Sequence, residues 1–220
     1  MRVVLVKLSG EVLGPALNWP RLEEVAALLE QAGRHARLGV VVGGGNLVRG
    51  RRWRGDRLWA DRMGMLATVL NGMALREALE ERGVPCELMS ALEVEGLRRY
   101  RPEEARRAIG QRLLLLVAGT GNPLLSTDTA AALRAAELGA ERLVKATKVD
   151  GVYEADPQRV AGARRFDRLS YEEAFRRGLE VMDGAALGVC REQAIPIQVV
   201  HWRDLVRALA GEPVGTVMGG

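Results

Sequence analysis

Residues 3–10, Val-Val-Leu-Val-Lys-Leu-Ser-Gly, decide the fold of this 220-residue chain. A short apolar run that passes directly into a glycine loop is typical of a strand buried on both faces of a parallel sheet. Residues 38–42 lead in the same way into Gly43-Gly44-Gly45, and residues 112–118 lead into Gly119. Because helical patterns separate these runs, we predict an α/β protein, a three-layer αβα sandwich with a mostly parallel central sheet.

The remaining segments continue the alternation of strand and helix patterns. Residues 151–170 are rich in loop residues and leave room for a hairpin. Since no repeat or long linker interrupts the chain, we expect a single domain over residues 1–220 with a soft division near residue 120. Helices are predicted over 21–33, 61–82, 102–109, 128–138, 171–177, 184–193 and 203–210, and strands over 86–90, 142–146, 196–200 and 214–218.

Composition narrows the class of protein. The chain has 32 Lys+Arg against 28 Asp+Glu, a net charge of +4. No apolar run reaches the ~20 residues of a membrane span, and the first residues lack a signal-peptide pattern. Cys86 and Cys190 are too few for a disulfide framework or a zinc site. We therefore expect a cytoplasmic protein without a membrane partner.

One cluster of basic residues raises the question of nucleic-acid binding. Arginines at 49, 51, 52, 54 and 57 are interleaved with Trp53 and Trp59. Arginines with aromatic residues can hold phosphates and stack bases. However, charges elsewhere are mixed in sign, and no RNP or zinc-finger signature is present. We favour a local anion site or a subunit contact and expect no nucleic-acid partner.

Lysine occurs only at Lys7, Lys145 and Lys148, whereas every other basic residue is arginine. A lysine ammonium is a compact point charge on a flexible stem, which suits a site that follows a moving phosphoryl group. These lysines flank strand ends, so we predict a phosphate-handling site assembled from both halves of the chain; chance placement is the alternative. Neighbouring strand positions face opposite sides, and whether Lys145 or Lys148 faces the phosphates stays open.

Glycine-rich loops support the phosphate interpretation. Ser9-Gly10, Gly43-Gly44-Gly45 and Gly119-Thr120-Gly121 each follow a predicted strand, at the edge where α/β sheets bind ligands. Glycine lets backbone N–H groups surround an anion. The loops match neither the Walker A pattern nor G-x-G-x-x-G, whose third glycine would fall on Val48. A tight turn with close helix packing is the alternative for the triple glycine.

Carboxylates complete the candidate site. Asp128 and Asp61 each stand near a predicted helix start, where an N-cap role is the alternative to a functional one. Asp150 and Asp156 flank the loop after Lys148, where Asp156 can also serve a turn. With only two histidines in unsuitable positions, no Ser-His-Asp or Cys-His set can be assembled. The inventory favours positioning and charge neutralisation, which is what phosphoryl transfer requires.

Five segments in order make the chain resemble the bacterial UMP kinases (uridylate kinases), a family of the amino-acid kinase superfamily. The similarity runs from the first predicted strand to residues 211–216. Glycine-rich and Asp-x-Met-Gly-Met segments narrow it to the UMP kinase branch. The segments are residues 6–11, 43–50, 61–68, 119–128 and 145–157.

This resemblance implies transfer of the ATP γ-phosphoryl group to UMP, with Mg²⁺ bound through nucleotide phosphates rather than by a protein metal site. It also implies a homo-oligomer, commonly a hexamer. The implied catalytic residues are Lys7, Asp128 and Arg49. The implied ATP-binding residues are Lys7, Leu8, Ser9, Gly10, Gly45, Arg49, Thr147, Tyr153 and Asp156. The implied UMP-binding residues are Gly44, Asp61, Thr120, Gly121, Asn122, Pro123, Leu124, Leu125, Ser126 and Thr127.

The chain departs from the family pattern in two places. The loop over residues 12–20 is shorter than usual, and the usual Thr-Thr-Asp reads Ser126-Thr127-Asp128. Two alternatives within the superfamily are a kinase that forms acyl phosphates and a non-catalytic nucleotide- or oxyanion-binding protein. Asp61 with Thr120–Asn122 argues against the first, because a nucleoside needs ribose and base partners. Retention of both Lys7 and Asp128 argues against the second.

The helix predicted from Asp61 carries more apolar residues than one core-facing stripe requires. Such a helix must bury a second face. We therefore predict a two-fold dimer through this helix, with the 49–57 segment near a subunit contact. The apolar residues are Met63, Met65, Leu66, Val69, Leu70, Met73 and Leu75.

Overall fold

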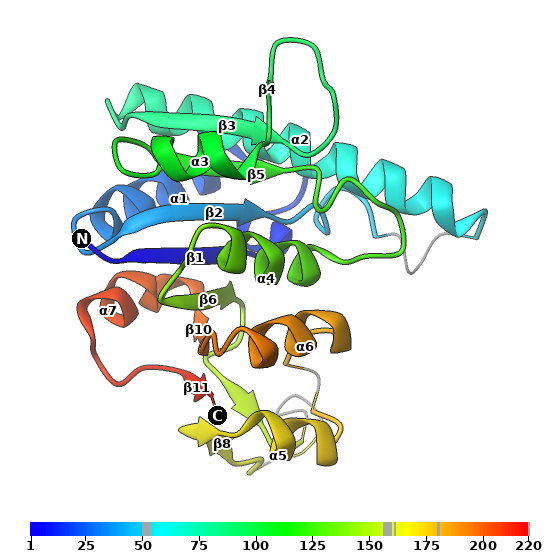
Figure 1. The fold of residues 1–220 in the computed structure, drawn as a ribbon, viewed down its shortest axis with the longest axis vertical. Coiled ribbons are helices and arrows are strands. Elements are labelled where there is room, and N and C mark those ends of the chain that lie inside the picture. The colour runs from blue at the N-terminus through cyan, green and yellow to red at the C-terminus, as the bar shows by residue number, and fades with distance from the viewer. Residues whose placement is uncertain (50–53, 156–159, 161, 180, 220) are drawn as a thin grey trace.

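The computed structural model describes residues 1–49, 54–155, 160, 162–179 and 181–219. Within these residues one sheet has the strand order β4-β3-β5-β2-β1-β6-β10-β11-β9 (Figure 1). All its neighbouring strands pair in parallel except β10 and β11. The bounds are β1 Val3–Leu8, β2 Arg37–Val42, β3 Cys86–Ser90, β4 Arg98–Arg99, β5 Leu113–Val117, β6 Arg142–Thr147, β9 Arg168–Leu169, β10 Ile197–His201 and β11 Thr216–Met218.

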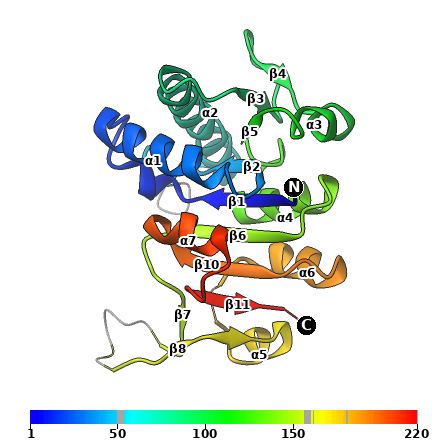
Figure 2. The ribbon, with the colours of Figure 1, turned by 90° about the vertical axis from the view of Figure 1, so that its left-hand side faces the viewer.

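Helices cover both faces of this sheet. Figure 2 shows α1, α2 and α7 on one side and α3, α4, α5 and α6 on the other. Each side closes its own apolar core, so the expected three-layer αβα sandwich is confirmed. No helix in the described part of the chain is both long enough and apolar enough to cross a membrane. The bounds are α1 Trp19–Ala32, α2 Arg57–Glu81, α3 Pro102–Ala108, α4 Thr127–Glu137, α5 Tyr171–Arg176, α6 Gly184–Glu192 and α7 Leu205–Ala210.

The predicted strands are confirmed within one or two residues, but three short elements were missed. These are β4, β9 and a 3-10 turn, η1, over Gly10–Leu13. A second short turn, η3, over Trp202–Asp204 precedes α7. The loop-rich stretch after residue 151 does contain a hairpin, in which β7 (Val152–Tyr153) pairs antiparallel with β8 (Arg165–Phe166).

The predicted start of the long helix at Asp61 is wrong. Helix α2 begins one turn earlier, at Arg57. The carboxylate of Asp56 caps it by accepting the N–H groups of Leu58 at 2.7 Å and Trp59 at 3.2 Å. Because Asp56 satisfies these otherwise unpaired N–H groups, Asp61 lies inside the helix and its side chain is available elsewhere.

Strand register brings the two halves of the chain together. Strands β1 and β6 are parallel neighbours, with Lys7 directly opposite Lys145. Residues two apart on a strand share a face. Leu5 and Leu143, two positions earlier, belong to the core on the α4 and α6 side. Both lysines therefore point to that side of the sheet.

Two glycines of α2 give a matched test of the packing. A Cβ at Gly72 would lie 2.4 Å from Cγ1 of Val117 and 3.1 Å from Cδ1 of Leu88, whereas a Cβ at Gly64 meets nothing within 4 Å. We expect Gly72→Ala to lower the free energy of unfolding by about 1–3 kcal/mol through overpacking. Gly64→Ala should raise it by up to about 1 kcal/mol through helix propensity. Urea denaturation measures both, and equal effects would contradict this packing.

Candidate active site

A carboxylate between two lysines forms the centre of the candidate site. The Lys7 Nζ lies 3.0 Å from Oδ1 of Asp128, and the Lys145 Nζ lies 2.9 Å from Oδ2. The three side chains are only 12%, 16% and 14% exposed, in the order Lys7, Lys145, Asp128. Lys145 also donates to the carbonyl of Val181 at 2.6 Å. One carboxylate thus fixes ammonium groups from two neighbouring strands.

Burial and charge shift the pKa values of this cluster in a consistent way. Burial lowers the pKa of Lys145, nearby Lys7 lowers it further, and Asp128 opposes both. Burial by itself raises the pKa of Asp128, but the positive charges of Lys7 and Lys145 outweigh it, so the pKa is lowered. Asp128 is therefore held ionised, as a partner for both cations.

The N-cap role considered for Asp128 is excluded by the structure. Ser126, not Asp128, caps helix α4: its hydroxyl accepts the N–H groups of Asp128 at 2.9 Å and Thr129 at 3.2 Å. The Ser126 hydroxyl also donates to Asp183, which accepts from the Thr129 hydroxyl at 2.9 Å. Asp183 in turn caps α6 through the N–H of Ala186. The starts of α4 and α6 are thus tied together, and the side chain of Asp128 is free to face the lysines.

Three hollows meet at this cluster. The central cavity, of about 560 Å³, is lined by Lys7, Asp128, Lys145 and Asp183, with Ser126 and Thr127 at its side. A hollow of about 530 Å³ shares Lys145 with it and is lined by Thr147, Tyr153 and the Gly178 region. A smaller one, of about 190 Å³, shares Ser126 and Thr127 and is lined by Gly44 and Asp61. The lysines lie between a hollow from each half of the chain.

The glycine loops approach too closely for any side chain. A Cβ on Gly10 would lie 2.7 Å from the Gly45 nitrogen and 2.8 Å from the Gly43 carbonyl oxygen. Buried Asn71 holds this contact, since its Nδ2 donates to the Gly43 carbonyl at 2.8 Å and to Oδ1 of Asn46 at 2.7 Å. The triple glycine is therefore a close backbone contact as well as a loop beside the cavity.

Asp61 organises the loop between β5 and α4. Its Oδ2 accepts the N–H of Leu124 at 2.9 Å, and Arg57 donates to both of its oxygens at 2.9 and 3.0 Å. Thr120 lies outside the small hollow and its hydroxyl accepts the N–H of Asn122 at 3.1 Å. Leu125, with Ser126 and Thr127, lines that hollow, whereas Leu124 is 64% exposed.

The other residues predicted to contact phosphates do not join the Asp128 cluster. Arg49 pairs with Glu11 rather than with Asp128, and Lys148 approaches the same Glu11 at 3.7 Å. Leu8 packs its side chain in the opposite core, so only its backbone faces this edge. The Ser9 N–H donates to the Ala146 carbonyl at 3.1 Å. Asp156 lies outside the described residues.

Strand register brings Lys145, and not Lys148, to the cluster of Lys7 and Asp128. Lys145 lies opposite Lys7 and contacts Asp128, whereas the Lys148 side chain is 58% exposed. Sequence reasoning missed Asn71, Thr68 and Asp183 altogether. Asn71 and Thr68 are polar residues within the apolar pattern of α2, and that interruption was the available signal.

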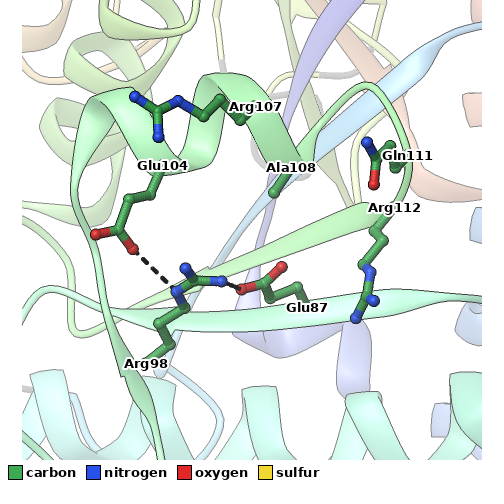
Figure 3. A pocket seen from close by; sticks show the side chains of 7 residues that line it. All are labelled: Glu87, Arg98, Glu104, Arg107, Ala108, Gln111 and Arg112. Atoms are coloured by element: carbon green, nitrogen blue, oxygen red, sulfur yellow. Dashed lines mark hydrogen bonds and ion pairs between the residues drawn. The ribbon is translucent and has the colours of Figure 1, made fainter.

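A further hollow, of about 300 Å³, lies apart from the lysine cluster (Figure 3). Arg98 crosses it between two carboxylates, with Nη1 2.6 Å from Glu87 and Nε 2.9 Å from Glu104. None of the predicted site residues lines it, and Glu87 and Arg112 place it toward the starts of β3 and β5. Arg98 thus pairs with both carboxylates that line this hollow.

Paired lysines and glycine loops at the carboxyl ends of parallel strands define an α/β protein that handles phosphate groups. Residues 2–201 match the model of the amino acid kinase family. A uridylate kinase of Legionella pneumophila is 42% identical, with 98% of this chain and 93% of the relative covered. The chain therefore belongs to the amino acid kinase family.

Solved structures agree with this assignment. The structure of UMP kinase from Bacillus anthracis is similar with a TM-score of 0.94 and 30% identity, over 99% of this chain and 96% of that one. The UMP kinase from Ureaplasma parvum gives a TM-score of 0.93 at 30% identity, over 100% and 99% of the two chains. The whole described architecture is thus shared with these kinases.

The lysine cluster predicts an unusual titration. Burial lowers the pKa of Lys145 from 10.5, whereas the charge and hydrogen bond of Asp128, together with the charge of Asp183, raise it. Because the chain has only three lysines, selective ¹³Cε labelling gives three signals for NMR, and Lys148→Met assigns one of them. We expect a lysine that titrates below 10.5, and a still lower midpoint in Asp128→Asn. A midpoint unchanged by Asp128→Asn would contradict the geometry.

Proposed function

We propose that this chain is a UMP kinase, which transfers the γ-phosphoryl group of ATP to UMP and releases UDP and ADP. The observation that carries the proposal is the position of the Lys7–Asp128–Lys145 cluster between a hollow from each half of the chain. The 42% identity to a uridylate kinase over nearly the full length supports the choice of substrate.

The two nucleotides are assigned to the two outer hollows. ATP occupies the one lined by Thr147 and Tyr153, with its phosphates directed to Lys7, Ser9–Gly10 and Gly45. UMP occupies the one lined by Gly44 and Asp61, with the 120–127 loop beside its ribose and base. The residues before about 120 then serve mainly UMP, and those after it mainly ATP.

The chemistry requires positioning more than covalent participation. An oxygen of the UMP phosphate forms the new bond to the γ-phosphorus while the bond to the ADP oxygen breaks. That acceptor oxygen is already deprotonated near neutral pH, since phosphate monoesters have a second pKa near ~6, so no general base is needed. Lys7 and Lys145 stabilise the charge on the moving group, and Asp128 fixes both ammonium groups before it arrives.

The residues present fit a magnesium ion that enters with ATP. Two lysines and two aspartates line the central cavity, so the charges of its side chains balance. The negative charge of the ATP phosphates would therefore need a further cation. In the described part of the chain no three His, Cys, Asp or Glu side chains gather as a metal site. Asp128 and Asp183 border the cavity, but phosphate oxygens would supply most ligands. When bound, Mg²⁺ neutralises phosphate charge.

A coupled ADP-release assay tests the proposal with UMP, CMP, acetylglutamate and carbamate as acceptors. We expect turnover with UMP, and a kcat lowered roughly 10²–10³-fold in Lys7→Ala, the loss typical of removing a preorganised charge donor. Turnover with acetylglutamate or carbamate instead would favour an acyl-phosphate-forming kinase. Absence of ADP release with every acceptor would favour a non-catalytic binding protein.

The second apolar face of α2 supports self-association. Leu66, Leu70 and Met73 are 52%, 51% and 49% exposed, and Trp59 continues the same stripe at 63%. Met65, Val69 and Leu75 meanwhile fill the core side of the helix. We infer a two-fold dimer through this stripe, in a cytoplasmic protein. The resemblance to the UMP kinases implies that such dimers assemble into a hexamer. Residues 50–53 lie outside the described part, so their expected contact is untested.

Light scattering tests the assembly. We expect a mass at least twice the 24.0 kDa of one chain, and a 24.0 kDa monomer for the double variant Leu66→Glu/Leu70→Glu. Phe175→Glu is the matched control, because Phe175 is 45% exposed on α5, away from the stripe. A wild-type monomer at micromolar concentration would contradict the dimer.

A further inference from the structure

Arg134 is a buried charged residue to which the proposed phosphoryl transfer assigns no role. It is 7% exposed within α4, and buried arginines are rare unless their groups are paired. Its Nη1 lies 2.7 Å from Oε2 of Glu137, and its guanidinium lies 3.9 Å from the centre of the Tyr100 ring. The Tyr100 hydroxyl donates to the same Glu137 oxygen at 2.7 Å. The three side chains therefore form a closed cluster.

The free side of this guanidinium reaches the loop that follows β5. Nη2 of Arg134 donates to the carbonyl of Gly119 at 3.5 Å. Ala118 and Gly119 both have left-handed backbones, with φ of 62° and 59°. Such a conformation is costly for alanine and persists only where the surroundings enforce it. Arg134 is one of the groups that enforce it.

Other contacts fix the rest of the turn. The Thr68 hydroxyl, buried in α2, accepts the N–H of Ala118 at 2.7 Å. A Cβ on Gly121 would lie 3.1 Å from the Ala91 carbonyl oxygen, so the backbone there is closely packed. Asp61 holds the far end of the loop at Leu124. Arg134 thus anchors the beginning of the segment whose end Asp61 anchors.

We propose that Arg134 is a positioning residue for the nucleoside monophosphate: it fixes Gly119, which lines the hollow assigned to UMP, and so sets the path of the loop that follows. The inference rests on the proposed function, in which this loop faces UMP. Within the described residues the polar contacts of Arg134 are with Glu137, Tyr100 and Gly119, and not with the lysine cluster. Its influence falls on the recognition of the acceptor and not on the donor.

Only arginine can make all three contacts of this position. Its planar fork stacks on Tyr100, pairs with Glu137 and still directs a second nitrogen at Gly119. A lysine keeps the positive charge but has no plane to stack and no second nitrogen. Arg134→Lys therefore removes the hold on the loop while retaining a cation for Glu137.

Arg142→Lys is the matched control. Arg142 is half-buried, donates to Oε1 of Gln198 and to the Ala208 carbonyl, each at 3.0 Å, and lies at the start of β6. In ADP-release assays we expect Arg134→Lys to raise KM for UMP roughly three- to tenfold, because the lost hydrogen bond comes from a charged group but is long and acts through the loop. KM for ATP should stay within about twofold. Arg142→Lys should shift neither KM, whatever it does to the melting temperature.

Selectivity provides the readout that a purely structural role would leave unchanged. If Arg134 aligns the groups facing the base, Arg134→Lys should lower the selectivity, measured as kcat/KM for UMP divided by kcat/KM for CMP. Arg142→Lys should leave this selectivity unchanged. Glu137→Gln, which keeps the arginine but weakens its anchor, should shift KM for UMP in the same direction by less. It serves as the test if the lysine variant does not fold.

The possible results distinguish the role of Arg134 from the proposed UMP kinase activity. A wild-type protein that does not phosphorylate UMP overturns the proposed function and this inference together. A wild-type protein that does so, with Arg134→Lys or Glu137→Gln raising both KM values equally or neither, overturns the inference alone. A rise in KM confined to UMP, with reduced selectivity over CMP, supports it.

Discussion

The contact between Asp128 and two lysines is the interaction on which the site depends. Bringing two ammonium groups into a largely buried position is costly unless a carboxylate compensates them, because desolvation and mutual repulsion both oppose it. Asp128 provides that compensation with one oxygen for each lysine. Its own position depends on Ser126, which caps α4, and on Asp183, which joins the starts of α4 and α6. Loss of any of these links would loosen both cations.

The sheet supplies the rest of the geometry. Parallel strands that alternate with helices bring their carboxyl ends to one edge, so loops distant in the sequence become neighbours. The in-register pairing of β1 with β6 puts Lys7 and Lys145 side by side. The glycines at positions 10 and 43 let two of these loops meet backbone to backbone. A central cavity with a hollow on either side thus arises between the two halves of the chain.

The sequence allowed the main strands, the sandwich and the residues Lys7 and Asp128 to be predicted, because buried strands and glycine loops leave a strong local pattern. The choice of Lys145 over Lys148 required the register of β6, which no local pattern specifies. Strands β4 and β9 are two residues long and exist through their partners. The start of α2 was misplaced because Asp56, and not Asp61, carries the cap. Asn71 and Arg134 act through contacts distant in sequence.

Lys145, which strand register brings to Asp128 opposite Lys7, is proposed to stabilise the transferred phosphoryl group together with Lys7. The matched pair Lys145→Met and Lys148→Met tests it most directly, since the two lysines are three residues apart and only Lys145 contacts Asp128. In single-turnover transfer from ATP to UMP, we expect a roughly 10²–10³-fold loss of rate for Lys145→Met and a change within a few-fold for Lys148→Met. Equal losses in both variants, or a larger loss for Lys148→Met, would contradict it.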